Sequence, residues 1–177
     1  KKLILTNAFP PENNIDLDEF IDLKINWLIK NNNLDLIKEF ILKNDHGELN
    51  SKLLKHYLDK NLSLGKVDKS CQIFSEMKII PEDNYILKYK IYCLLHQGQN
   101  EVAQLQYDLL KETGFKDEFF EKKIFQLIGF EESSNEVSDK NLLELHLSHR
   151  IAEDFKYTPK QNTPRDIWKY LASANLL

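Results

Sequence analysis

Arginine, valine, threonine, glycine and proline are all scarce in this chain of 177 residues. Only two of its 24 basic residues are arginines, Arg150 and Arg165, and 28 acidic residues bring the net charge to −4. Nucleic-acid-binding surfaces gather basic residues, so this balance argues against a nucleic-acid partner. Three valines, four threonines, five glycines and five prolines provide little material for strands and tight turns, which argues against a multi-stranded sheet.

Long apolar runs are also lacking. No run approaches the roughly 20 residues that a membrane-spanning helix needs, so we expect a soluble chain with no direct membrane insertion. Leu3-Ile4-Leu5 is too short for the apolar region of a signal peptide. The chain begins with Lys1-Lys2 and its last helical pattern shows no stop signal before Leu177. We therefore expect a piece of a longer polypeptide, either cytoplasmic or extracytoplasmic.

Leucine and isoleucine are abundant, with 28 and 16 copies, and they recur at helical spacing. Four glycines (Gly65, Gly98, Gly114 and Gly129) each follow such a run, where a helix end favours a residue that tolerates positive φ. The sequence therefore predicts an all-α fold. We expect about nine helices, near residues 16–31, 34–43, 51–61, 66–77, 85–97, 100–112, 117–128, 139–152 and 163–177.

Capping residues and apolar stripes refine this prediction. Asp16 with Glu19, and Thr163 with Asp166, have the spacing of capping boxes at the first and last helices. The inward stripes are predicted to comprise Phe20, Leu23, Trp27 and Leu28 in the first helix, Val102, Leu105 and Leu109 in the sixth, and Ile167, Trp168 and Leu171 in the last.

An internal repeat runs through the first half of the chain. Leu34, Val67 and Val102 begin the second helix of three predicted helix pairs and lie 33 and 35 residues apart. The run His96-Gln97-Gly98-Gln99-Asn100-Glu101-Val102-Ala103, followed by Tyr107, resembles the hairpin turn of the tetratricopeptide repeat, whose period is near 34 residues. The resemblance covers about residues 18–113, although Ile37 and Ser70 stand where that family prefers alanine. The alternative is an irregular helical bundle with coincidental spacing.

The resemblance implies a right-handed α-solenoid of antiparallel helix hairpins. We expect the repeat array over residues 15–129, a flexible acidic loop over 130–138, and further C-terminal helices over 139–177. In the family the first helix of each hairpin lines a binding groove. The matching residues here are Asn26, Lys55, Asp59, Lys88, Tyr92 and His96. They are predicted to form a groove of mixed charge for a peptide, or else an ordinary solvated face.

Cys71 and Cys93 are the only cysteines, which excludes a disulfide-rich scaffold. Both belong to inward stripes, and they lie at similar distances in sequence from the turn near Pro81. We therefore expect them to be neighbours in the core. They are either two buried thiols or a single bridge, which would need an oxidising compartment such as the periplasm.

No pattern for catalysis, a cofactor or a metal stands out. Glu144, His146 and His149 share one predicted helix, but no HExxH pattern accompanies them, and His149 is in register with the packing residues Leu142 and Leu145. No serine lies in a glycine-rich elbow, and no loop is suited to hold phosphate. We expect no catalytic residue, cofactor or metal site, and therefore no enzyme.

The sequence thus predicts a non-catalytic protein–protein interaction or scaffold region of a larger polypeptide. One alternative is the superhelical, non-catalytic region of an extracytoplasmic cell-wall enzyme. A second is an RNA-binding helical repeat, which shares a period near 35 residues but is disfavoured by the net charge of −4.

Overall fold

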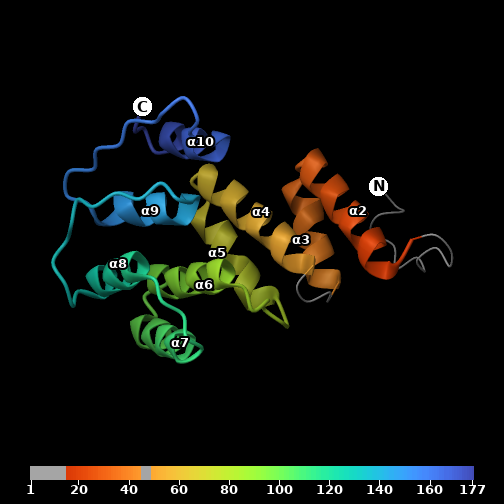
Figure 1. The fold of residues 1–177 in the computed structure, drawn as a ribbon, viewed down its shortest axis with the longest axis horizontal. Coiled ribbons are helices and arrows are strands. Elements are labelled where there is room, and N and C mark those ends of the chain that lie inside the picture. The colour runs from red at the N-terminus through yellow and green to blue at the C-terminus, as the bar shows by residue number, and fades with distance from the viewer. Residues whose placement is uncertain (1–14, 45–48) are drawn as a thin grey trace.

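The computed structural model describes residues 15–44 and 49–177, and this part of the chain is all-helical (Figure 1). The prediction of an all-α fold with about nine helices is confirmed for these residues. The helices are α2 (Leu17–Asn31), α3 (Leu34–Lys43), α4 (Leu49–Ser63), α5 (Val67–Glu76), α6 (Asn84–His96), α7 (Asn100–Glu112), α8 (Glu118–Ile128), α9 (Leu142–Ile151) and α10 (Arg165–Ser173). Residues 45–48, between α3 and α4, lie outside the described residues.

Local signals set most of the helix ends. The carboxylate of Asp16 accepts a hydrogen bond from the backbone N–H of Glu19 at 2.8 Å, as expected for the N-cap of α2. Asn32, Gly65 and Gly98 have left-handed φ angles of 49°, 68° and 74°, and each ends the first helix of a hairpin. Glycine adopts this conformation without strain, and asparagine tolerates it better than most residues do.

The three left-handed residues correct the predicted repeat register. Asn32, Gly65 and Gly98 are evenly spaced, and each is followed two residues later by the start of a second helix. These helices begin at Leu34, Val67 and Asn100, so Val102 is not equivalent to Leu34 and Val67. The predicted alignment paired Val102 with Leu34 and Val67 because all three side chains are apolar, although the helix itself begins at residue 100 as predicted.

The first three hairpins pack in chain order. Helix α2 contacts α3 and α4, α4 contacts α5 and α6, and α6 contacts α7 and α8. In addition, α3 packs on α4 and α5 packs on α6, so the second helix of each of these two hairpins also touches the next hairpin (Figure 1). No helix in the described part of the chain is long and apolar enough to cross a membrane.

The predicted inward stripe of α2 is wrong in part, and that of α7 is wrong throughout. In α2 the buried residues are Ile21, Ile25 and Leu28, whereas Leu23 is 58% exposed. In α7 the buried residues are Ala103, Tyr107 and Leu110. The predicted stripe of α7 faces outward instead, with exposures of 47% for Val102, 57% for Leu105 and 47% for Leu109. Each helix carries two apolar stripes, and tertiary packing buries only one.

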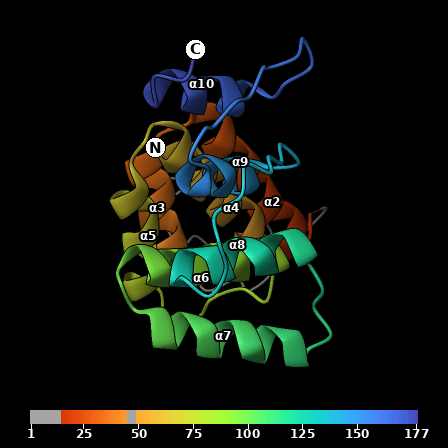
Figure 2. The same cartoon turned by 90° about the vertical axis from the view of Figure 1, so that its left-hand side faces the viewer.

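The C-terminal helices fold back across the hairpins. Helix α9 contacts α4 and α8, and α10 contacts α4 and α9. Seen from the left-hand side of Figure 1, α9 lies between α8 and α10 (Figure 2). The segment 130–138, predicted to be a flexible loop, follows α8 and is hydrogen-bonded to it through Lys123 Nζ, which donates to the carbonyl and hydroxyl oxygens of Ser134 at 3.3 Å.

Both ends of α10 differ from the prediction. No side chain caps its N-terminus, because the hydroxyl of Thr163 accepts from the backbone N–H of Lys160 instead, at 2.8 Å. At the C-terminus Asn175 has a φ of 56°, and the N–H of Leu176 donates to the carbonyl of Leu171 at 2.9 Å. This is a Schellman-type stop, so the prediction that the helix runs to Leu177 is wrong. Ile167 and Leu171 are buried as predicted, but Trp168 is 39% exposed.

Candidate functional site

The six predicted groove residues all lie on first helices of hairpins. Asn26 belongs to α2, Lys55 and Asp59 belong to α4, and the remaining three (Lys88, Tyr92 and His96) belong to α6. We call the surface that carries these six residues the candidate face. The structure divides it into an open part on α2 and the start of α4, and a part on α6 and the end of α4 that α9 and α10 cover.

The open part carries an exposed polar network. Asn26 donates through Nδ2 to Asp22 at 2.7 Å and accepts from Lys52 Nζ at 2.7 Å. Lys55 Nζ lies 2.6 Å from a carboxylate oxygen of Asp83, at the start of the next hairpin. These side chains are accessible and their charges are largely matched.

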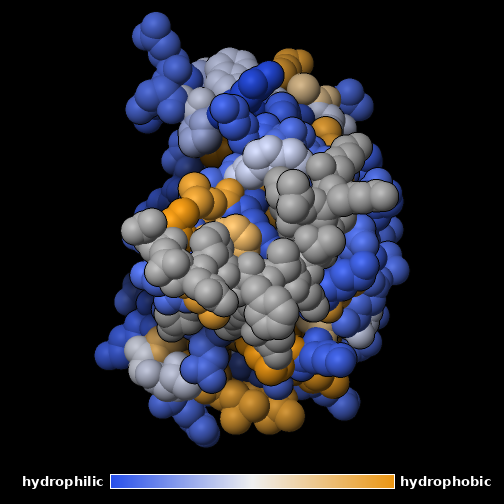
Figure 3. Space-filling view, turned by 90° about the vertical axis from the view of Figure 1, so that its right-hand side faces the viewer, coloured by the Kyte–Doolittle hydropathy of each residue, from blue (hydrophilic) through white to orange (hydrophobic). Residues whose placement is uncertain are grey.

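Figure 3 looks at this end of the molecule, where α2 and α3 lie in Figure 1. Hydrophilic side chains form much of the rim in this view. Apolar side chains gather at the lower edge and in a smaller patch near the middle.

The covered part begins at Lys88, whose side chain is only 8% exposed. Its Nζ lies 2.8 Å from Asp117 Oδ2, at the start of α8, and 3.4 Å from Glu144 Oε1 on α9. Burial raises the pKa of Asp117, but hydrogen bonds from Lys88 and the N–H of Phe120 outweigh this and hold it below its ordinary value. Lys88 therefore joins α6, α8 and α9 through a buried ion cluster and is not available to an external ligand.

Tyr92 is also buried and leads into a chain of aromatic hydroxyl and imidazole groups. Its hydroxyl lies 2.5 Å from Nε2 of His146 on α9. Nδ1 of His146 lies 2.9 Å from the hydroxyl of Tyr170 on α10, which in turn lies 2.7 Å from Nδ1 of His149. We call these four residues the Tyr–His chain; it connects α6, α9 and α10.

One arrangement of protons satisfies every group in the Tyr–His chain. Among the described residues the Tyr92 hydroxyl bonds His146 alone, so its proton has an acceptor only if Tyr92 donates to Nε2. His146 then donates through Nδ1–H to Tyr170, and Tyr170 donates to Nδ1 of His149. Both imidazoles must be neutral for this arrangement.

The pKa shifts in the Tyr–His chain agree with neutral imidazoles. Burial lowers the pKa of His146 to about 3, with smaller contributions from Arg150, His149 and His96. Burial and Arg150 also lower the pKa of His149. The Tyr–His chain is therefore uncharged near neutral pH, and its four side chains can be buried without leaving an unpaired charge.

The remaining two residues of the candidate face are engaged as well. The hydroxyl of Tyr85 donates to Asp59, and burial raises the pKa of this carboxyl to about 6 despite that hydrogen bond. His96 stacks on the ring of Tyr92, with ring centroids 6.0 Å apart, and its Nε2 lies 2.8 Å from Asp68 Oδ1. Neither side chain is an isolated, unsatisfied polar group.

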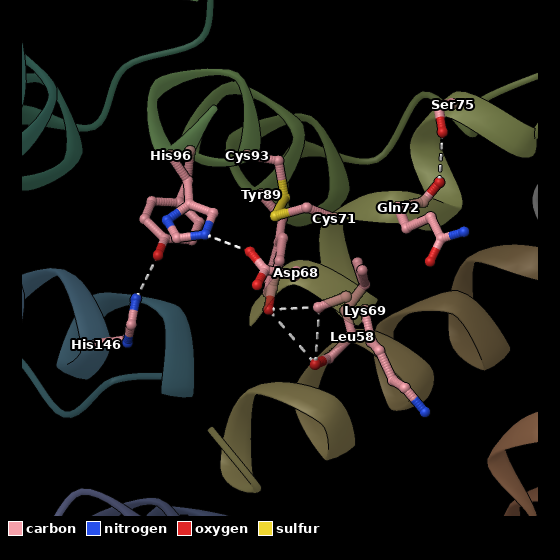
Figure 4. The surroundings of a disulfide bond; sticks show 12 residues. Leu58, Asp68, Lys69, Cys71, Gln72, Ser75, Tyr89, Cys93, His96 and His146 are labelled. Atoms are coloured by element: carbon pink, nitrogen blue, oxygen red, sulfur yellow. Dashed lines mark hydrogen bonds and ion pairs between the residues drawn. A yellow bond between two sulfur atoms is a disulfide. The ribbon is translucent and has the colours of Figure 1, made fainter. Parts of the chain in front are cut away.

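The cysteines lie next to this part of the candidate face. Cys71 on α5 and Cys93 on α6 form a disulfide, with Cα atoms 5.3 Å apart (Figure 4). The prediction that the two residues are neighbours is confirmed, and of the two alternatives the structure contains the bridge. Figure 4 shows His96 turned toward Asp68 beside the bridge, and His146 pointing toward α6 from the opposite side. The disulfide joins the second hairpin to the third.

The three side chains considered as metal ligands, Glu144, His146 and His149, form hydrogen bonds within the fold instead. Glu144 accepts hydrogen bonds from Ser138 Oγ at 2.6 Å and from Asn141 Nδ2 at 2.8 Å, besides its contact with Lys88. His146 and His149 both bond the hydroxyl of Tyr170. Among the residues that the structure describes, no group of three or more His, Cys, Asp or Glu side chains is arranged to hold a metal ion.

A second surface feature lies outside the candidate face. A cleft of about 340 Å³ lies along the surface shared by α6 and α7 and is lined partly by Leu87, Ile91 and Leu109. The exposed stripe of Val102, Leu105 and Leu109 continues from it along α7. The sequence signalled these apolar side chains but not that they face outward.

The burial of Lys88 and Tyr92 under α9 is the feature that sequence reasoning missed. The only sequence signal was the unusual density of tyrosine and histidine in the helices that now face one another.

In comparisons with known proteins, no family model, no curated protein and no solved structure matches the chain.

Proposed function

We propose that this chain is a non-catalytic, tetratricopeptide-like helical-repeat region that binds a protein or peptide segment within a larger scaffold. The observation that carries the proposal is the recurrence of one hairpin geometry. Three hairpins turn at evenly spaced left-handed residues (Asn32, Gly65 and Gly98), and a second helix starts two residues after each of them. A fixed period of this kind is typical of repeat arrays.

The helix packing supports a solenoid of stacked hairpins. Helices α3 and α5 pack on the first helix of the next hairpin as well as on their own, so neighbouring hairpins share a core. The fourth residue of each second helix (Ile37, Ser70 and Ala103) is fully buried. These are the positions at which the resemblance places a small residue for close helix approach.

We further propose an extracytoplasmic compartment. A buried disulfide between Cys71 and Cys93 is expected to form and persist where the environment is oxidising, such as the periplasm. The same disulfide favours a second candidate function, the superhelical non-catalytic region of a cell-wall enzyme. The two candidates differ in whether a catalytic module belongs to the same polypeptide.

RNA binding has less support. Lys55, Lys60 and Lys88 on the candidate face and its border are each paired with a carboxylate, and their charges are therefore already compensated. A phosphate backbone would need such cations free.

Site-specific photo-crosslinking tests the interaction function. A photoreactive residue replaces the exposed Asn26, and in a control chain it replaces the exposed Gln72 on α5. Crosslinking is done in the compartment where the chain resides, followed by mass spectrometry. The proposal expects a protein joined at position 26 and absent at position 72. Identical products at both positions, or none at either, would contradict it.

A further inference from the structure

Helix α10 is held to the rest of the molecule by one face. It has nine residues, fewer than an isolated helix needs for stability in water. Ile167, Tyr170 and Leu171 are its buried side chains, at the i, i+3 and i+4 positions typical of a helix bound in a groove. Asp166, next to the first anchor, pairs with Lys60 on α4 at 2.5 Å.

The surface beneath α10 forms hydrogen bonds with a tyrosine hydroxyl. Helix α10 packs on α4 and α9, and the hydroxyl of Tyr170 is bonded by both His146 and His149. A phenylalanine at this position would leave the buried Nδ1–H of His146 without an acceptor, which is costly. The surface therefore distinguishes tyrosine from phenylalanine and an acidic residue from a basic one.

A non-helical segment connects α10 to α9. Residues 152–164 contain no helix, and their side-chain contacts include Tyr157, whose hydroxyl donates to Asp139 at 2.8 Å. Helix α10 is thus a ligand at the end of a tether, and tethering gives it an effective concentration of the order of mM.

We infer that the α4–α9 surface is a helix-docking site whose resident ligand is α10, and that it accepts from a partner protein a helix with the pattern acidic–aliphatic–x–x–Tyr–Leu. This inference rests on the proposed function, since it names the partner of the covered part of the candidate face. The partner helix would make the contacts that Asp166, Ile167, Tyr170 and Leu171 make in the free chain. It would have to displace α10 to do so.

Binding of the chain's own helix as a separate peptide tests this inference. The probe is a fluorescent peptide with the sequence of residues 163–177, and its binding is followed by anisotropy. The full chain carrying Ile167→Asp and Leu171→Asp has an emptied site, and we expect it to bind the peptide saturably. The wild-type chain should bind at least tenfold more weakly, because α10 competes in cis.

Two changes test the specificity. A peptide with Tyr170→Phe should bind at least tenfold more weakly than the parent peptide. The peptide with Asp166→Lys should lose binding to the emptied chain, and regain it when that chain also carries Lys60→Glu. Equal binding of the parent, Tyr170→Phe and scrambled peptides would overturn the inference.

Controls separate loss of fold from loss of the site. The emptied chain must keep the circular dichroism of its helices and the Cys71–Cys93 disulfide. As a second measurement, excess peptide should speed hydrogen exchange of α10 amides in the wild-type chain and leave those of α6 unchanged. A folded chain that binds no peptide and shows no change in exchange would refute the docking site.

The same measurements distinguish other occupants and the proposed function. If unlabelled wild-type chain displaces the peptide and sediments as a dimer, the occupant is a second copy and the assignment to a partner protein is wrong. If the peptide binds as expected but no partner is crosslinked at position 26, the proposed function fails while the docking site stands.

Discussion

The two parts of the candidate face hold the same kind of ion pair in opposite surroundings. In the open part, the side chains of Lys52 and Asp22 are 54% and 48% exposed and lie 3.3 Å apart. In the covered part, the side chains of Lys88 and Glu144 are 8% and 6% exposed and lie 3.4 Å apart. Distance alone would make the two pairs equivalent.

Burial makes the two ion pairs differ in what each contributes to stability. An exposed pair is screened by water and contributes little, whereas removing one partner of a buried pair leaves a charge that nothing compensates. The covered part also contains the Tyr–His chain, whose groups depend on one another for their hydrogen bonds. The covered part therefore determines where α9 and α10 lie, while the open part can change partners at low cost.

The largest expected effect comes from removing the buried cation. Lys88→Met leaves Asp117 and Glu144 without their shared partner, and we expect the free energy of unfolding to fall by about 3–5 kcal/mol in urea denaturation. The control is the double variant with Glu144→Gln, which removes one of the stranded charges and should recover part of the loss. Strictly additive losses would show that Lys88 and Glu144 are not coupled.

The disulfide at the seam between the second and third hairpins should have the next largest effect. Replacing Cys71 and Cys93 by alanine frees a loop with a sequence separation of 22. The expected loss is about 3 kcal/mol in the free energy of unfolding, by the loop-entropy argument. Reduction of the wild-type chain should shift its urea midpoint to that of the double variant. A midpoint that reduction leaves unchanged would contradict a structural bridge.

Sequence patterns predicted the local features of this molecule well. Asp16 caps the first helix, Gly65 and Gly98 turn two hairpins, and Cys71 and Cys93 meet across a turn. Each of these depends on residues close in sequence or on the simple geometry of an antiparallel pair. The end of α10 at Asn175 could also have been predicted, because asparagine can replace glycine at a left-handed position after a helix.

Contacts between residues far apart in sequence could not be predicted from local patterns. The pair of Lys60 and Asp166 joins residues 106 positions apart, and the contact of Tyr92 with His146 spans 54. No periodicity encodes which face of α6 will receive α9. The same limit explains α7, where Ala103, Tyr107 and Leu110 compete with an equally apolar stripe that remains exposed.

A pH titration separates two opposing contributions in the covered part. The folded-state pKa of His146, about 3, lies below its ordinary 6.5, so its stabilising effect is complete above pH 6.5 and is lost as the pH falls toward 3. The folded-state pKa of Asp59, about 6, lies above its ordinary 3.8. Its contribution is therefore complete below pH 3.8 and is lost as the pH rises through 6.

The directions of these two pKa shifts predict how the stability of Asp59→Asn depends on pH. Between pH 7 and pH 4.5 the wild-type chain gains stability at Asp59, which offsets part of the loss at His146. The variant lacks this gain, so its free energy of unfolding should fall by about 2 kcal/mol more than that of the wild type over this interval. The measurement is urea denaturation at both pH values. Parallel pH profiles would show that Asp59 titrates normally.

Tyr170→Phe tests the Tyr–His chain with a change of one oxygen atom. It leaves the Nδ1–H of His146 without an acceptor, and we expect a loss of about 1.5 kcal/mol together with faster hydrogen exchange in α10. Tyr157→Phe is the matched control, because the hydroxyl of Tyr157 donates to an exposed carboxylate, Asp139. Its loss should be smaller, and a larger loss in the control would contradict a special role for the buried chain.

The smallest effect is expected in the open part and completes the comparison with Lys88. Lys52→Met makes the same chemical change as Lys88→Met, but its partners Asp22 and Asn26 remain in water and bond each other at 2.7 Å. The free energy of unfolding should change by less than about 0.5 kcal/mol, and this difference should vanish in high salt. A loss approaching that of Lys88→Met would mean that the open part is as strongly coupled as the covered part. In that case burial would not be what separates the two parts of the candidate face.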